Sequence, residues 1–134
     1  MLSASIKMYK IKDFIRWTET GEIHLEGSKK AIHTLAAAAG YHAGHNILID
    51  LRDTTISQYD MGQMLELALE IARYKSVFSG RIANVIPNDK KRLKGARQFK
   101  TLMDVQGFQY EIFTDFEAAI EWLSDVKELG SQKE

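Results

Sequence analysis

The fold follows from one stretch of sequence, Asn46-Ile-Leu-Ile-Asp-Leu-Arg-Asp-Thr-Thr-Ile-Ser-Gln-Tyr-Asp-Met-Gly62, which continues to Leu69. Its apolar run, Ile47–Leu51, is typical of a strand that is covered on both faces. A polar loop is expected at Arg52–Tyr59, and Asp60 is a natural N-cap for the helix that follows. In an open α/β sheet, ligands bind where the carboxyl ends of strands face helix N-termini. The stretch therefore predicts where a site lies before it says what the site does.

The other elements follow from apolar periodicity and from turn residues. Strands are expected at Ile6–Ile11, Phe14–Thr20, Ile47–Leu51, Arg81–Ile86 and Phe108–Phe113, and helices at about Gly27–Ala39, Asp60–Lys75, Lys90–Val105 and Asp115–Val126. The order β-β-α-β-α-β-α-β-α predicts a single α/β domain, with a mixed, mainly parallel five-stranded sheet and about four helices. This domain covers residues 1–126, and a polar C-terminal tail is expected at 127–134.

Local signals also predict how these elements begin and pair. Lys12-Asp13 separates the first two strands and favours an antiparallel hairpin. The later strands alternate with helices, which favours parallel pairing through right-handed crossovers. Ser28 is the expected N-cap of the first helix. Pro87-Asn88-Asp89 is expected to end the fourth strand and to cap the third helix, which Gly107 ends. Thr114 with Glu117 forms the expected capping box of the last helix.

Composition limits the class of function. The chain has 134 residues, with 18 Lys and Arg balanced by 18 Asp and Glu, and it has no cysteine. A neutral chain lacks the positive field that non-specific nucleic-acid binding requires, so no nucleic-acid partner is expected. No apolar run approaches the roughly 20 residues that span a bilayer, so no membrane insertion is expected. The absence of cysteine excludes disulfides and thiolate sites and fits a cytoplasmic protein.

Four segments, in order and spacing, resemble the STAS superfamily and, more closely, its SpoIIAA-like uncharacterised members. They are Gly21-Glu22-Ile23, Ile47–Leu51 with Arg52-Asp53, Gly80–Val85, and Phe113–Leu123 with its Ala-x-x-Trp-Leu ending. The resemblance covers about Ile6–Leu123 and implies the fold and the regulatory role of bacterial anti-sigma-factor antagonists. Those antagonists resemble one another in an Asp-Ser-Ser/Thr-Gly element that carries a phosphorylated serine. This chain has Gln58-Tyr59-Asp60-Met61 in the equivalent region, so a phosphorylation switch of that kind is not expected.

The expected site is the loop after the third strand together with the adjacent face of the second helix. Its residues are Asp53, Thr54, Thr55, Ser57, Tyr59, Asp60, Met61 and Met64. The preferred function is a non-enzymatic, STAS-like regulatory or protein-interaction module, whose partner is another protein or a second copy of the chain. One alternative is a carrier of a small hydrophobic molecule or lipid, with Met61, Met64 and Leu65 lining part of a closed apolar cavity between the sheet and the helices. Another is a small enzyme that uses Asp53 with a nearby histidine.

Two further groups of residues, a set of histidines and a basic helix, are alternative candidates for a binding site. His42 and His45 are three apart and could share a metal with His33, but two flanking glycines favour a solvated loop, so no metal site is expected. Basic residues in the third predicted helix could hold a phosphate or an acidic partner, although a solvated face with long side chains lying along it is favoured. They are Lys90, Lys91, Arg92, Lys94, Arg97 and Lys100. No catalytic residue and no cofactor are expected, because no Gly-x-Ser-x-Gly, Walker or dinucleotide motif occurs.

Overall fold

The computed structural model describes residues 3–10, 13–40, 44–56 and 60–133, and its centre is a four-stranded parallel sheet. The strand order is β2-β3-β4-β5, and the helices lie between and after these strands. The strands are β1 (Ser3–Lys10), β2 (Phe14–Ile23), β3 (Asn46–Ile56), β4 (Arg81–Val85), β5 (Gln109–Phe113) and β6 (Asp125–Lys133). The helices are α1 (Leu25–Gly40), α2 (Met61–Ala72), α3 (Lys90–Val105) and α4 (Phe116–Leu123). The predicted α/β class with four helices is confirmed, whereas the predicted mixed sheet of five strands is wrong, because this sheet has four strands, all parallel.

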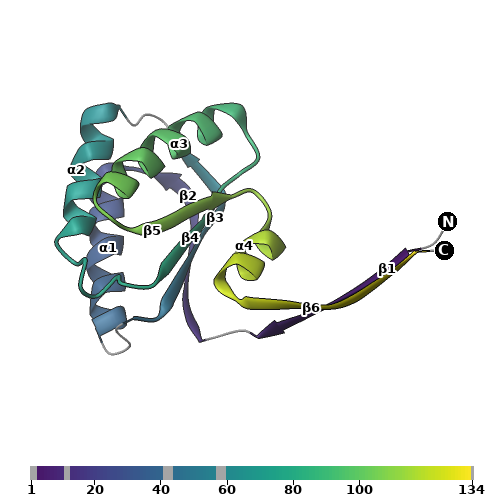
Figure 1. Ribbon diagram of the computed structural model, residues 1–134. Coiled ribbons are helices and arrows are strands. Elements are labelled where there is room, and N and C mark those ends of the chain that lie inside the picture. The colour runs from purple at the N-terminus through teal and green to yellow at the C-terminus, as the bar shows by residue number, and fades with distance from the viewer. Residues whose placement is uncertain (1–2, 11–12, 41–43, 57–59, 134) are drawn as a thin grey trace.

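Helices cover both faces of the parallel sheet (Figure 1). One face carries α1, α2 and α3 over a core that includes Ile47, Ile82 and Tyr110. The other face carries α4, whose Ala119 and Leu123 pack in a core with Leu48 of β3 and with Ala83 and Val85 of β4. Successive residues of a strand point to opposite faces, so a central strand under both layers has no polar side to present. This explains the apolar run in the first half of β3, which is broken only by Asp50.

The predicted hairpin between the first two strands is wrong. β2 pairs in parallel with β3 along its length, from Phe14 opposite Asn46 to Ile23 opposite Ile56. The sequence favoured the hairpin because the two strands are close in the chain. Pairing with β3 instead lets β2 extend the buried parallel sheet, in which Ile15 and Trp17 pack against the core under α1.

β1 pairs with β6 in a separate antiparallel ribbon, from Ser3 opposite Lys133 to Lys10 opposite Asp125. The ribbon projects from the body of the domain (Figure 1). The predicted polar tail at 127–134 thus lies largely within β6, which ends at Lys133. Its polar composition gave no signal for a strand, because the pairing partner lies more than a hundred residues away in the chain.

The helices α2, α3 and α4 each begin at an aspartate N-cap. Asp60 and Asp89 cap α2 and α3, accepting hydrogen bonds from the backbone N–H groups of Gln63 and Arg92. Both caps were predicted. The other two starts differ: α4 is capped by Asp115 and not by Thr114, and α1 begins at Leu25, before the predicted Ser28 cap.

Candidate functional site

A cavity of about 360 Å³ lies between the sheet and the layer formed by α1, α2 and α3. Small residues leave this space open: Ala31 on α1, and Gly95 and Ala96 on α3, line it where larger side chains would fill it. Most of the remaining wall is apolar and includes Trp17, Ile32, Ile49, Leu51, Met64, Leu67, Ile71, Phe78, Phe99 and Met103. Protein interiors hold few voids larger than a water molecule, whereas small-molecule pockets measure roughly 300–1,000 Å³. The volume therefore lies within the range of small-molecule pockets.

Two polar side chains lie together in this apolar wall. Asn84 on β4 donates from Nδ2 to the hydroxyl oxygen of Tyr110 on β5, at 2.6 Å. The buried Oδ1 of Asn84 has no hydrogen-bond partner among the described residues. Tyr110 is 4% exposed, and burial raises the pKa of its hydroxyl, which keeps the group protonated. The pair is an uncharged polar group in the wall that the sheet contributes to the cavity.

The charged residues of the cavity wall lie toward the carboxyl edge of the sheet. Glu19 is in the second half of β2, and Lys91 and Arg92 are in the first turn of α3. Glu19 accepts a hydrogen bond from Nε1 of Trp17 at 2.8 Å. Arg92 donates to the carbonyl and to Oγ1 of Thr54, at 2.8 and 3.0 Å, and burial lowers the pKa of its guanidinium. These contacts fasten the start of α3 to the end of β3, so that edge of the cavity has a fixed shape.

The predicted loop after the third strand is shorter than expected. β3 continues to Ile56, because Asp53–Ile56 pair with the end of β2. Thr54 is consequently buried, and its hydroxyl donates to the carbonyl of Leu51 at 2.6 Å, whereas Asp53 and Thr55 are exposed. The predicted site residues Ser57 and Tyr59 lie outside the described residues.

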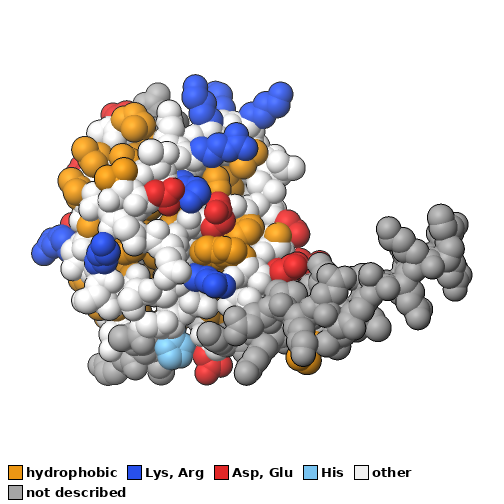
Figure 2. All heavy atoms as spheres, in the orientation of Figure 1, with side chains coloured by type: hydrophobic (Ala, Val, Ile, Leu, Met, Phe, Trp, Pro, Cys, Tyr) orange, Lys and Arg blue, Asp and Glu red, His pale blue; other side chains and the backbone are white. Residues whose placement is uncertain are grey.

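The rest of the predicted site is divided between two faces of α2. Met64 is buried and lines the cavity, as the carrier alternative anticipated. Met61 and Leu65, which that alternative also placed in the cavity, are 50% and 44% exposed, so this part of the expectation is wrong. With Leu69, at 49% exposure, they repeat every four residues along the helix. Residues four apart share one face, so Met61, Leu65 and Leu69 form an exposed apolar stripe, and apolar side chains are seen gathered over α2 in Figure 2.

The predicted basic helix is α3, with a cluster of Lys and Arg side chains over its N-terminal part (Figure 2). Lys90, Lys91, Lys94 and Arg97 are exposed there, as the solvated-face interpretation requires. Lys100 instead donates to Asp104 and to the carbonyl of Tyr110, at 3.1 and 3.0 Å. It thereby ties α3 to β5.

A second charged group lies on the opposite face of the sheet. Asp50 is 4% exposed, and its carboxylate accepts from Arg52 at 2.9 and 2.8 Å and from Arg16 at 3.0 Å. The hydrogen bonds from the Arg52 side chain, opposed by burial and supported by the Arg52 N–H and by Arg16, lower the pKa of Asp50 to about 2. Both guanidinium carbons lie 4.8 Å from the centre of the Phe116 ring. The carboxylate thus organises two arginines over α4.

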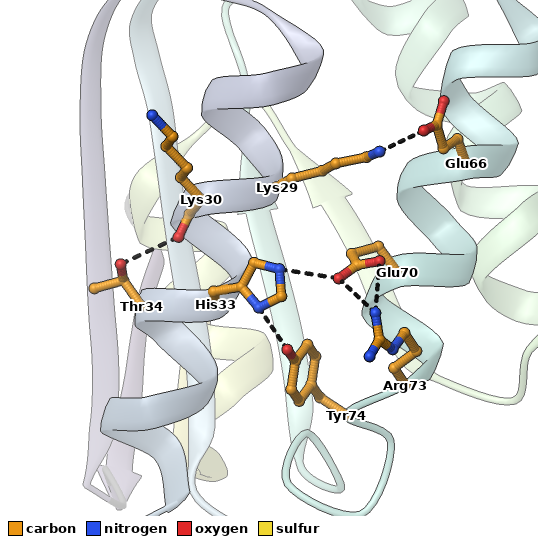
Figure 3. Close-up of polar contacts among 8 residues, drawn as sticks. All are labelled: Lys29, Lys30, His33, Thr34, Glu66, Glu70, Arg73 and Tyr74. Atoms are coloured by element: carbon orange, nitrogen blue, oxygen red, sulfur yellow. Dashed lines mark hydrogen bonds and ion pairs between the residues drawn. The ribbon is translucent and has the colours of Figure 1, made fainter.

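A network of polar side chains joins α1 to α2 (Figure 3). His33 contacts Tyr74 through Nδ1 at 2.5 Å and Glu70 through Nε2 at 3.0 Å. The sequence of contacts, from hydroxyl to imidazole to carboxylate, is also that of a catalytic nucleophile, its general base and the acid that orients the base. None of the three residues lines the cavity, and half of the His33 side chain is exposed. With the neighbouring ion pair of Lys29 and Glu66, the network fastens the two helices together.

In the part of the chain that the structure describes, no group of three or more histidine or acidic residues could hold a metal ion. His42, one of the histidines weighed from the sequence, lies outside that part. No helix within it has the length and apolar character needed to cross a membrane.

Comparisons with protein-family models, with curated proteins and with solved structures give no significant match to this chain. The resemblance to the STAS superfamily therefore stays a prediction.

The polar pair and the small residues that make the cavity were not predicted, although one alternative expected an apolar cavity between the sheet and the helices. Asn84 gave a signal, because it is an amide within the apolar strand Ile82-Ala83-Asn84-Val85. Tyr110 gave none, because tyrosine is common in strands.

Proposed function

We propose that this protein is a non-enzymatic binding module that holds a small, mainly apolar molecule between its sheet and α1, α2 and α3. The observation that carries the proposal is the cavity of about 360 Å³ with an apolar wall and few polar groups. At roughly 30 Å³ for each water-sized group, this volume accommodates about twelve of them. That is the size of a two-ring aromatic or a medium-length aliphatic chain.

The composition of the wall supports the same function. Ile49, Leu51 and Phe99 keep part of their surface accessible although helices cover this face of the sheet. A core without a ligand would gain stability by burying that surface, at roughly 25 cal/mol for each Å² removed from water. A bound apolar molecule covers this surface, and the free energy of that burial contributes to its binding affinity.

Calorimetric titration with naphthalene tests the proposal. The protein is expected to bind it saturably with one site, and Ala31→Phe is expected to abolish binding because the new ring occupies the cavity. Ala38→Phe is the matched control, since Ala38 lies on the same helix and is exposed. Absence of binding to the unmodified protein, or equal binding by the Ala31→Phe and control variants, would contradict the proposal.

The apolar stripe of Met61, Leu65 and Leu69 favours a second candidate function, which is the STAS-like protein-interaction module expected from the sequence. Three neighbouring exposed apolar side chains on one helix form the core of a helix-in-groove contact. Affinity purification with the double variant Leu65→Gln/Leu69→Gln tests it. A specific partner should be lost with that variant and kept with Val105→Gln, which removes an equally apolar residue, 77% exposed, from the end of α3. A partner that survives both substitutions would rule out the stripe as its binding surface.

A further inference from the structure

The polar pair in the cavity has more hydrogen-bonding capacity than its own contact uses. Asn84 offers two N–H donors and a carbonyl acceptor, and the Tyr110 hydroxyl offers one donor and one acceptor. The bond from Asn84 Nδ2 to the hydroxyl oxygen leaves Oδ1 of Asn84 without a partner among the described residues. Turning the amide over would satisfy Oδ1 through the tyrosine and leave the N–H donors unmet. One polar atom therefore stays unpaired in either orientation.

An unpaired polar atom at this depth is costly. Leaving a buried donor or acceptor unsatisfied costs roughly 1–3 kcal/mol, whereas an apolar pair of the same shape would be nearly neutral. Asn84 lies on β4, a central strand, and Tyr110 on its neighbour β5. The two residues are diagonal neighbours, because Ile82 is opposite Tyr110 and Asn84 is opposite Ile112. Their place on rigid strands fixes the direction in which the pair offers its free groups.

We infer that the ligand is an uncharged apolar molecule that carries a hydroxyl group, and that Asn84 and Tyr110 bind this hydroxyl. This inference rests on the proposed function and specifies the ligand class. A hydroxyl donates one hydrogen bond and accepts others, so it donates to Oδ1 of Asn84 and accepts from the O–H of Tyr110. A carboxylate has acceptors alone and leaves Oδ1 unsatisfied, and the pair carries no positive charge to offset the desolvation of an anion. Naphthalene fills the same space and leaves the pair as it is.

Three probes of similar shape distinguish these cases: naphthalene, 1-naphthol and 1-naphthoate, each titrated by calorimetry. The protein is expected to bind 1-naphthol about tenfold more tightly than naphthalene, which is the effect of one net hydrogen bond. It is expected to bind 1-naphthoate more weakly than either. Equal affinities for 1-naphthol and naphthalene would overturn the inference and leave the proposed function standing, because a water molecule would then serve the pair. Tightest binding of 1-naphthoate would also overturn it and would point to Lys91 and Arg92.

Two substitutions connect the preference to the pair. Asn84→Leu keeps a similar volume and removes the unpaired amide, and Tyr110→Phe removes the hydroxyl alone. Each is expected to reduce the preference for 1-naphthol to about twofold or less while naphthalene binding is retained. Tyr74→Phe removes the hydroxyl of a tyrosine that does not line the cavity, so it is the matched control and should keep the tenfold preference. Retained naphthalene binding shows that each variant is folded, so a preference that survives both substitutions would refute the assignment.

If no probe binds the unmodified protein, the proposed function fails together with the inference. If all three bind and the preference is absent, the inference alone fails.

Discussion

Asp50→Asn should remove a stabilising charge whose contribution depends on pH in a defined window. The carboxylate is buried and held by Arg52 and Arg16, which lower its pKa from 3.8 to about 2. A group whose pKa is lowered in the folded state stabilises the protein above the unfolded pKa and loses that effect as pH falls toward the folded pKa. The difference between the unfolded and the folded pKa corresponds to about 2 kcal/mol of unfolding free energy at pH 6, at roughly 1.4 kcal/mol for each tenfold change in proton affinity.

Urea denaturation of the unmodified protein and of Asp50→Asn at several pH values measures this contribution. The difference in unfolding free energy between the two proteins should shrink by about 1 kcal/mol from pH 6 to pH 3 and nearly vanish in its charge-dependent part by pH 2. Asp53→Asn removes the same charge from the same strand and controls for net charge. A difference that stays constant over this range would refute the assignment of the low pKa to the arginine pair.

Three substitutions at helix boundaries and interiors test the local structure by the same denaturation assay. Gly95→Ala should stabilise the protein by about 0.5–1 kcal/mol, because alanine favours the helix. The new Cβ would lie 3.6 Å from the Met64 side chain, which is an ordinary contact. A loss of stability would contradict the packing of α2 on α3. Gly107→Ala should have the opposite effect and cost about 1 kcal/mol, because the residue has a φ of +85° that side chains rarely adopt; an unchanged stability would argue against that backbone conformation. Asp60→Ala should cost about 1 kcal/mol through loss of the capping box with Gln63, and a neutral result would place the start of α2 elsewhere.

Local signals predicted the helices well. The start of α3 was predicted at Lys90 because Pro87-Asn88-Asp89 ends a strand and supplies a cap, and both are properties of neighbouring residues. The end of the same helix was equally clear, since Gly107 adopts the positive φ that follows many helices.

Strand pairing could not be obtained in the same way. β1 and β6 are joined by hydrogen bonds between residues at opposite ends of the chain, and nothing in the composition of Asp125–Lys133 indicates a strand. The extension of β3 to Ile56 likewise depends on the end of β2, with which it pairs, and its own sequence is typical of a polar loop. Strand pairing depends on two segments, so the residue pattern of one segment does not identify its partner.

One alternative expected a cavity between the sheet and the helices with Met64 in its wall, but most of the wall was not predicted. A cavity arises where side chains are too small to meet, as at Ala31 and Gly95, and the same residues occur at tightly packed helix contacts. The sequence therefore distinguished an apolar helix face from a polar one, and could not tell a filled core from an open one.

The methionine methyl groups provide the most direct test of where a ligand binds. Met64 and Met103 line the cavity, whereas Met8 and Met61 are about half exposed. In an NMR titration of methyl-labelled protein with naphthalene, ring-current shifts are expected for the Met64 and Met103 signals, with those of Met8 and Met61 unchanged. Shifts confined to Met61 would place the binding surface on the exposed stripe of α2, and would contradict a ligand site between the sheet and its three helices.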